Sequence, residues 1–329
     1  MNLEAVLEAF THLRVLVAGD LCLDHWCHYE PALADPSRET GIPRVAVVES
    51  ETSPGAAGTV AANVAALGAT VDVLSLIGND GAGLELRRAL AQRSIGSRLL
   101  FESPDFRTFT YTKLINRRTG VEDLPRLDFV NTRPLASDAE ARILAGLESA
   151  AADYQVILVS DQAETPQGGV VTPRFREALA AISGRVVWVD SRLRAELFRR
   201  VIVKPNQREA EEASLRLLGR VDFEELRRRM EAPLLLITHG PRGATVVDAR
   251  GSTPVPAAAS QHTVDTCGAG DSFSAGAAMT LAITGDAVTA ARVGNLTAAV
   301  TISKKGTATA SPPEVLDRYR RCGSSERAG

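Results

Sequence analysis

Residues 265–271 read Asp-Thr-Cys-Gly-Ala-Gly-Asp and directly precede a sequence typical of an α-helix. Gly268 and Gly270 lack Cβ atoms, so the backbone can approach an anion closely. The free N–H groups and the dipole of a helix's first turn also favour an anion at this position. The carboxylate of Asp271 suits a base that orients an attacking hydroxyl and accepts its proton. The alternative is an aspartate that caps a tightly packed helix.

The same segment resembles the C-terminal signature DTxGAGD of the PfkB family of carbohydrate kinases, in the ribokinase-like superfamily, and matches every specified position. Further similarities follow in family order over roughly residues 13–312. The resemblance implies that Asp271 is the catalytic base and that Gly268, Ala269 and Gly270 form the anion hole. We therefore expect direct in-line transfer of the γ-phosphoryl group of ATP to a sugar hydroxyl. The expected cofactors are Mg²⁺ and a monovalent cation such as K⁺.

Asn206 and Glu209 form an Asn-x-x-Glu segment at the end of a predicted strand. The segment resembles the family's NxxE motif, which implies that Asn206 lies near the nucleotide phosphates and that Glu209 binds Mg²⁺ through water. Mg²⁺ needs few direct protein ligands because it retains water and binds phosphate oxygens. Helix capping is the alternative interpretation of the same spacing.

Thr238, Gly240 and Gly243 belong to a segment that resembles the family's TxGxxG motif, which lines the nucleotide site; a glycine-rich turn is the alternative. Asn295 corresponds to a family position close to the adenine. The sequence contains no GxxxxGK[ST] loop, and no GxGxxG follows the first predicted strand. These absences disfavour a P-loop enzyme and a dinucleotide-binding oxidoreductase.

The acceptor side of the site is expected where the first predicted strand ends. Asp20 and Asp24 lie in a Gly-Asp-Leu-Cys-Leu-Asp stretch that resembles a family motif whose final aspartate binds sugar hydroxyls. A carboxylate can accept two such hydrogen bonds. Gly55 and Thr59 lie in a stretch that resembles the N-terminal family signature, although threonine replaces the usual sugar-binding asparagine and an alanine replaces the second glycine. For Asp24, a capping role in a surface loop is the alternative.

Lys113 and Arg126 lie in or beside predicted exposed strands, where they can reach a phosphate on the acceptor. Arg126 and Asp128 belong to a Pro-Arg-Leu-Asp-Phe stretch that resembles the family branch acting on heptose 7-phosphate. Glu164 stands where that branch has a basic residue, and the branch's glutamine pair is missing. A kinase for an unphosphorylated monosaccharide is therefore the alternative. The second, nucleotidyl-transferring domain of two-domain relatives is not expected in this chain.

Alternating strands and helices must position these residues. Predicted helices separate predicted strands at 13–18, 71–76, 156–160, 186–190, 201–204 and 234–238. The predicted helices that matter most for the site are 55–67, 269–284 and 287–303. This rhythm predicts a three-layer α/β/α sandwich, ribokinase-like, with a mostly parallel sheet. Exposed strands that do not fit this alternation predict a small β-sheet lid near residues 24–50 and 105–130. We expect one kinase domain over residues 1–321, followed by a flexible tail over 322–329.

The composition narrows the functional classes. Of the 329 residues, 45% are hydrophobic, which is typical of a globular protein. The formal net charge of −3 provides no positive field that would attract nucleic acid. The acidic N-terminus lacks the pattern of a signal peptide, and no apolar run reaches the ~20 residues of a membrane span. The four cysteines are too few and too scattered for a disulfide framework. We expect a cytoplasmic protein.

The expected ligands are ATP and a sugar or sugar phosphate, with neither nucleic acid nor membrane as a partner. We also expect a homodimer formed through the lid. A non-catalytic sugar or nucleotide sensor with the same fold is the rival interpretation. The joint presence of Asp271, Asn206 and Glu209 argues against that rival.

Overall fold

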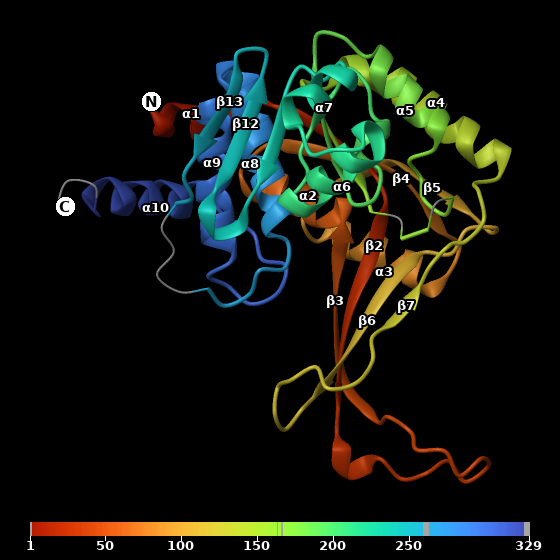
Figure 1. Cartoon of the computed structure of the whole chain (residues 1–329). Coiled ribbons are helices and arrows are strands. Elements are labelled where there is room, and N and C mark those ends of the chain that lie inside the picture. Colours follow the sequence, from red (N-terminus) through yellow and green to blue (C-terminus); the bar gives the residue numbers. More distant parts are fainter. Residues whose placement is uncertain (1, 163, 166, 259–262, 326–329) are drawn as a thin grey trace.

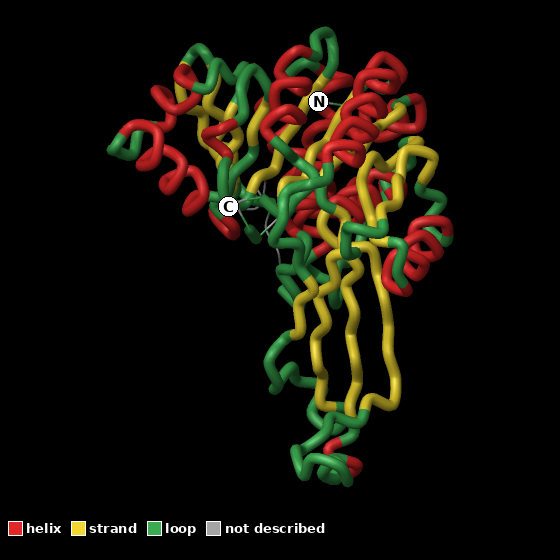
Figure 2. Tube along the Cα trace, turned by 90° about the vertical axis from the view of Figure 1, so that its right-hand side faces the viewer, coloured by secondary structure: helices red, strands yellow, loops and turns green. Residues whose placement is uncertain are grey.

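The computed structural model describes residues 2–162, 164–165, 167–258 and 263–325. Figure 1 shows a main body, in which helices cover a central sheet, and a thin second sheet that extends from it. In Figure 2 the strands of the second sheet run side by side away from the main body, and their connecting loops lie farthest from it. No helix in the described part of the chain is long and apolar enough to cross a membrane.

The main sheet is mostly parallel. Among the described residues it has nine strands, in the order β13-β12-β11-β10-β9-β8-β1-β4-β5. Pairing is parallel from β11 to β5, and β12 and β13 add an antiparallel edge. The strands are β1 (Arg14–Gly19), β4 (Thr70–Gly78), β5 (Gly96–Ser103), β8 (Val156–Asp161), β9 (Val186–Ser191), β10 (Ile202–Val203), β11 (Leu235–Thr238), β12 (Ala244–Asp248) and β13 (Gly251–Val255).

Each face of this sheet has its own apolar core. On β1, Val15 and Val17 belong to one core and Leu16 and Ala18 to the other, because successive side chains point to opposite faces. The helices of the first core are α1 (Leu3–Ala9), α2 (Ala57–Ala66), α3 (Gly81–Ala91), α8 (Ala269–Thr284), α9 (Ala287–Thr301) and α10 (Pro312–Ser325). Those of the second are α4 (Ser137–Ala150), α5 (Pro173–Ala181), α6 (Gln207–Leu218) and α7 (Phe223–Arg229). The three-layer sandwich predicted from the sequence is confirmed.

The second sheet, called the lid below, is separate and small. Its order is β3-β2-β6-β7, with strands β2 (Leu21–Tyr29), β3 (Val47–Ala56), β6 (Phe109–Asn116) and β7 (Leu127–Phe129). The chain passes directly from β1 into β2 with only Asp20 between them. Gly19 permits this passage because its φ is +112° and a Cβ there would lie 2.2 Å from the carbonyl oxygen of Ser160.

Several boundaries differ from the sequence predictions. The helix predicted from residue 55 begins at Ala57, because the residues before it pair with β2 as part of β3. The local pattern predicts neither β2 nor β5, since polar and apolar residues follow one another there without a clear period. Helix α10 ends at Ser325, so the first part of the predicted tail is helical, and residues 326–329 lie outside the described residues.

Candidate active site

Helix α8 begins at the glycine-rich signature. Gly268 is its N-cap with φ +76°, and among the described residues no side chain caps its first N–H groups. A Cβ at Gly268 would lie 3.2 Å from Cγ2 of Thr59, and one at Gly270 would lie 3.2 Å from Nζ of Lys204. The predicted anion hole of Gly268, Ala269 and Gly270 therefore lies at the open N-terminus of a long helix, a position that favours an anion.

A cavity of about 190 Å³ lies between this helix terminus and the lid. Its described lining includes six of the residues predicted from the sequence: Asp24, Thr59, Lys113, Arg126, Gly268 and Asp271. Sequence reasoning did not assign the others to it: Cys22, Trp26, Ala56, Tyr111, Gln162, Glu164, Arg192, Cys267 and Thr307. A pocket on which charged side chains of both signs converge is suited to a polar acceptor.

One face of the lid forms a wall of this cavity. Cys22, Asp24 and Trp26 are every second residue of β2, and Tyr111 and Lys113 are every second residue of β6. The parallel register pairs Asp24 with Tyr111 and Trp26 with Lys113. Because alternate side chains of a strand point to one face, these five side chains share the face that borders the cavity.

Asp271 lies on the first turn of α8 and lines the cavity. Burial raises the pKa of Asp271 to about 7, the charge of Asp190 adds to the rise, and Lys204 opposes it. Lys204 is buried and binds Asp190, with 2.7 Å between Nζ and Oδ2. A carboxyl group that is partly ionised near neutral pH has the proton affinity that general-base catalysis favours.

Asp24 lies on β2 and lines the same cavity. Burial raises the pKa of Asp24 to about 6, while the Cys22 thiol, which donates to Oδ1 over 3.7 Å, and the charge of Lys113 favour the ionised form. On the paired strand, a Cβ at Gly55 would lie 2.6 Å from that Oδ1, so the close approach requires glycine. Gly55 thus shapes the space around Asp24, and the described lining does not include it.

Other predicted acceptor residues bind neighbouring parts of the protein. The carboxylate of Asp20 accepts hydrogen bonds from two backbone N–H groups in the loop after β8, at 2.9 and 2.7 Å. Asp128 accepts two hydrogen bonds from Arg126, at 2.7 and 2.6 Å. The hydroxyl of Thr59 donates to a backbone carbonyl at 3.3 Å. Asp20 and Asp128 therefore hold the site together from outside the described lining of the cavity.

Asn206 and Glu209 begin helix α6 as a capping box. Oδ1 of Asn206 accepts the N–H of Glu209 at 2.9 Å, and Oε2 of Glu209 accepts the N–H of Asn206 at 2.8 Å. The capping interpretation of this spacing is therefore correct, and it leaves the second carboxylate oxygen available for another role. Asn206 also pairs with Thr238 in a parallel bridge, which brings two predicted nucleotide segments together.

The remaining predicted nucleotide residues surround the ends of β11, β12 and β13. Thr238 ends β11, and the turn that follows contains Gly240 with φ +60° and Gly243 with φ +94°. A Cβ at Gly243 would lie 2.2 Å from a backbone carbonyl oxygen of β13, so the turn requires glycine. Asn295, in α9, is buried and donates to the carbonyl just after β13 at 2.9 Å. The described lining of the acceptor cavity includes none of these residues.

The charges near Lys204 fit a hydrated magnesium ion. Burial lowers the pKa of Lys204, but the charges of Asp190, Glu209 and Asp271 raise it further than burial lowers it. Burial raises the pKa of Glu209, and the charge of Asp190 raises it further. Three carboxylates around one ammonium leave a negative excess that a divalent cation would neutralise. Within the described chain there is no group of three His, Cys, Asp or Glu that could hold a metal ion directly.

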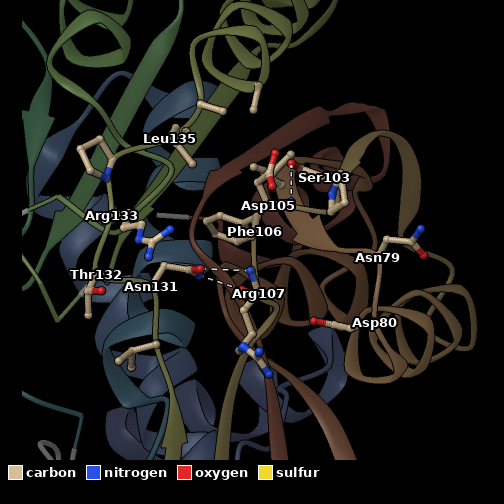
Figure 3. A pocket seen from close by; sticks show the side chains of 16 residues that line it. Asn79, Asp80, Ser103, Asp105, Phe106, Arg107, Asn131, Thr132, Arg133 and Leu135 are labelled. Carbon is tan, nitrogen blue, oxygen red and sulfur yellow. Dashed lines mark hydrogen bonds between the residues drawn. The ribbon is translucent and has the colours of Figure 1, made fainter.

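A larger cavity, of about 400 Å³, lies beside the base of the lid. Figure 3 shows Arg133 and Phe106 pointing toward one another in it, and Asn131 bonded to the backbone of Arg107. Its described lining contains none of the residues predicted for the site. The smaller cavity is the candidate active site, because the carboxylates with raised pKa values converge there.

Residues 22–314 match the family described as pfkB family carbohydrate kinase. The bifunctional protein HldE of Bradyrhizobium diazoefficiens is 30% identical over 328 residues, which cover 96% of this chain and 64% of that protein. HldE of Nitrosococcus oceani is 33% identical over 320 residues, which cover 94% of this chain and 64% of that protein. The chain thus spans less than two thirds of the length of these relatives.

Solved structures show the same fold. Phosphofructokinase-2 from Escherichia coli, in complex with potassium, has a TM-score of 0.72 at 20% identity and covers 94% of this chain and 99% of its own. Ribokinase from Arabidopsis thaliana, complexed with ribose and ATP, has a TM-score of 0.65 at 16% identity, and the match covers 93% of this chain and 98% of the ribokinase chain. The family match over most of the chain, together with this fold, shows that the protein belongs to the PfkB family of carbohydrate kinases.

Proposed function

We propose that the protein is an ATP-dependent kinase that transfers the γ-phosphoryl group directly to a hydroxyl of a sugar or sugar phosphate. The observation that carries this proposal is the position of Asp271. It lies on the first turn of α8, lines the same cavity as Asp24 and Lys113, and has a pKa of about 7. A base, a carboxylate able to bind hydroxyls and an anion-binding helix terminus thus meet at one space, as in-line phosphoryl transfer requires.

In the proposed mechanism Asp24 accepts hydrogen bonds from acceptor hydroxyls and fixes the sugar in the cavity. Asp271 orients the attacking hydroxyl and accepts its proton as the bond to phosphorus forms. The N–H groups at the start of α8 stabilise the charge that develops on the phosphoryl oxygens. Glu209 would hold Mg²⁺ through water beside the nucleotide, and the ion would supply neutralising charge there. The lid limits access of water to the transfer.

The nucleotide is proposed to lie against the start of α6 and the β11–β12 turn. Asn206 would lie near its phosphates, Thr238, Gly240 and Gly243 would line its site, and Asn295 would lie close to the adenine. The bridge between Asn206 and Thr238 supports a common site. A monovalent cation such as K⁺ belongs to the same proposal, and replacement of K⁺ by a large organic cation in the assay tests it.

For the acceptor we propose a heptose 7-phosphate. The resemblance of residues 125–129 to that branch and the HldE relatives support this choice, and Lys113 and Arg126 supply positive charge in the cavity. The test is ADP release from ATP with heptoses, hexoses and pentoses, each free and phosphorylated. Faster turnover of a heptose phosphate than of the free sugars would support the choice. Equal turnover of both forms would favour a monosaccharide kinase, and no ADP release with any sugar would favour a sensor.

We also propose a homodimer formed through the lid. The edge strands of the lid, β3 and β7, expose the apolar side chains of Val47, Val48, Leu127 and Phe129. Exposed apolar groups on an unpaired strand edge favour association with another chain. Sedimentation should show a dimer, and Phe129→Lys should shift it toward monomer. If the protein without the substitution is a monomer at micromolar concentration, the proposal is refuted.

A further inference from the structure

The acceptor cavity contains a carboxylate that bridges two arginines. Oε1 of Glu164 lies 2.9 Å from Nη1 of Arg192 and 3.9 Å from Nη2 of Arg126. All three residues belong to the described lining of the cavity. One oxygen of Glu164 therefore occupies the space between two guanidinium groups that come from distant parts of the chain.

Both arginines are positioned by contacts other than those with Glu164. Arg126 is held by Asp128 through two hydrogen bonds and lies over the ring of Tyr111, with 4.9 Å between the guanidinium carbon and the ring centroid. Arg192 directly follows β9, and its backbone N–H donates to a carbonyl at the end of β8 at 3.1 Å. Glu164 lies in the loop after β8, and its side chain is 34% exposed. When the carboxylate leaves, Arg126 therefore keeps its side-chain contacts and Arg192 keeps its backbone position at the end of β9.

The described lining of the cavity has equal numbers of acidic and basic side chains: Asp24, Glu164, Asp271, Lys113, Arg126 and Arg192. A phosphate monoester adds about −1.5 to −2 charges at neutral pH. It would compete with the carboxylate of Glu164 for the same donors. Guanidinium groups suit phosphate because each planar fork can hold two of its oxygens.

We propose that Arg126 and Arg192 form a phosphate subsite of the acceptor cavity, and that the carboxylate of Glu164 occupies this subsite until a phosphate replaces it. The inference rests on the proposed kinase function and adds the residue that tunes the preference for a phosphorylated acceptor. Glu164 lowers the apparent affinity of the protein for phosphate, because only those protein molecules in which the Glu164 carboxylate has left the subsite can bind phosphate. Free sugars do not need the subsite, so Glu164 does not weaken their binding.

The test compares Glu164→Gln with the unchanged protein and with Glu140→Gln. Glu140 is a matched control because it also pairs with an arginine, Arg174 at 3.1 Å, but lies on α4 outside the described lining of the cavity. Calorimetry measures the binding of inorganic phosphate and of mannose 6-phosphate. Glu164→Gln should lower both Kd values about fivefold, which corresponds to about 1 kcal/mol, the upper value for an exposed ion pair. Glu140→Gln should change neither.

A double variant separates this subsite from the anion hole at α8. The gain in phosphate affinity should disappear in Glu164→Gln/Arg126→Gln, because Arg126 belongs to the subsite and not to the helix terminus. Equal affinities of Glu164→Gln and the unchanged protein, or a gain that persists in the double variant, would overturn the proposal. A gain for inorganic phosphate without one for mannose 6-phosphate would overturn the assignment to the acceptor. The phosphate-binding measurement does not depend on turnover. A lack of ADP release would therefore refute the kinase function without refuting the phosphate subsite.

Discussion

The pKa of Asp271 leads to a measurable pH dependence. Burial and the charge of Asp190, opposed by Lys204, set this pKa at about 7. A base must be ionised to act, so activity should be lost as the pH falls through about 7. A group with this pKa is ionised to about one tenth at pH 6 and to about nine tenths at pH 8. We therefore expect kcat/KM to rise about tenfold from pH 6 to pH 8.

Asp24 should add to the loss at lower pH. Burial raises its pKa to about 6, so the carboxylate that binds hydroxyls becomes protonated below this value. The rate should then fall more steeply below pH 6 than a single ionisation allows. Both ATP and sugar are kept below their KM values in the assay, because the rate then reports the ionisations of the free enzyme.

The variant Asp271→Asn removes the base and keeps the size of the side chain. General-base catalysis contributes roughly 10²–10⁴-fold, and the variant should lose about that factor in turnover. Its remaining activity should not rise tenfold between pH 6 and pH 8. ATP should bind as tightly or more tightly, because a negative charge beside the phosphates is removed and the backbone of the anion hole is unchanged.

The assay is sugar-dependent ADP formation from about pH 5 to about pH 9, with ATP binding measured by calorimetry. Asp286→Asn is the matched control: Asp286 caps α9 through the N–H of Thr289, and asparagine caps a helix equally well. This control should keep the activity and pH profile of the unchanged protein. A variant Asp271→Asn that retains more than about a tenth of the turnover would refute the assignment of the base. A flat profile between pH 6 and pH 8 in the unchanged protein would do the same.

Three further outcomes are expected. Glu209→Gln should raise the Mg²⁺ concentration for half-maximal rate while its capping bond persists; an unchanged Mg²⁺ dependence would remove Glu209 from the site. Asp24→Ala should weaken sugar binding at least about tenfold and leave ATP binding nearly intact, since hydrogen bonds to a charged group contribute ~1.5–3 kcal/mol each. Equal losses for both ligands would show that Asp24 supports the fold instead. Asp271→Asn should stabilise the fold at pH 8 by about 2 kcal/mol, allowing for solvent in the open cavity. The folded pKa of about 7 exceeds the usual 3.8, so the stabilising contribution of this carboxyl is complete below pH 3.8 and is lost as the pH rises through about 7. Urea unfolding at pH 8 measures the difference, and equal stabilities would contradict the raised pKa.

Local sequence signals predicted the elements that carry Asp271 and the central strands. Two glycines before a long run of small apolar residues predict a helix start, and α8 begins at Ala269. Strands buried on both faces give continuous apolar runs, so β1 and β8 could be located without any knowledge of the fold. The capping box at Asn206 and Glu209 was also predictable, because its hydrogen bonds depend only on a spacing of three residues.

The rest of the cavity could not be predicted from local patterns. Arg192, Glu164 and Tyr111 meet there only because the strand order places the ends of β9 and β8 side by side, and β1, the neighbour of β8, continues through Asp20 into the lid. One signal was available for Arg192: it lies two residues after the predicted strand 186–190, and open α/β sheets bind ligands at the carboxyl ends of their strands. For Tyr111, the period of two that links it to Lys113 indicates a shared face, but not what the face borders.

The ion pair of Lys204 explains how the half-buried Asp271 keeps a useful proton affinity. Burial and the charge of Asp190 raise the pKa of Asp271, and Lys204 lowers it. Without the ammonium group, Asp190 would lack its partner and Asp271 would be protonated at neutral pH, which would remove the base. If Lys204 bound Asp271 directly, the carboxylate would be too weak a base to take a proton from a sugar hydroxyl. Because Lys204 binds Asp190 at 2.7 Å instead, its charge acts on Asp271 from a distance. A buried ion pair contributes little to stability, so the Lys204–Asp190 pair is better explained by its effect on the pKa of Asp271.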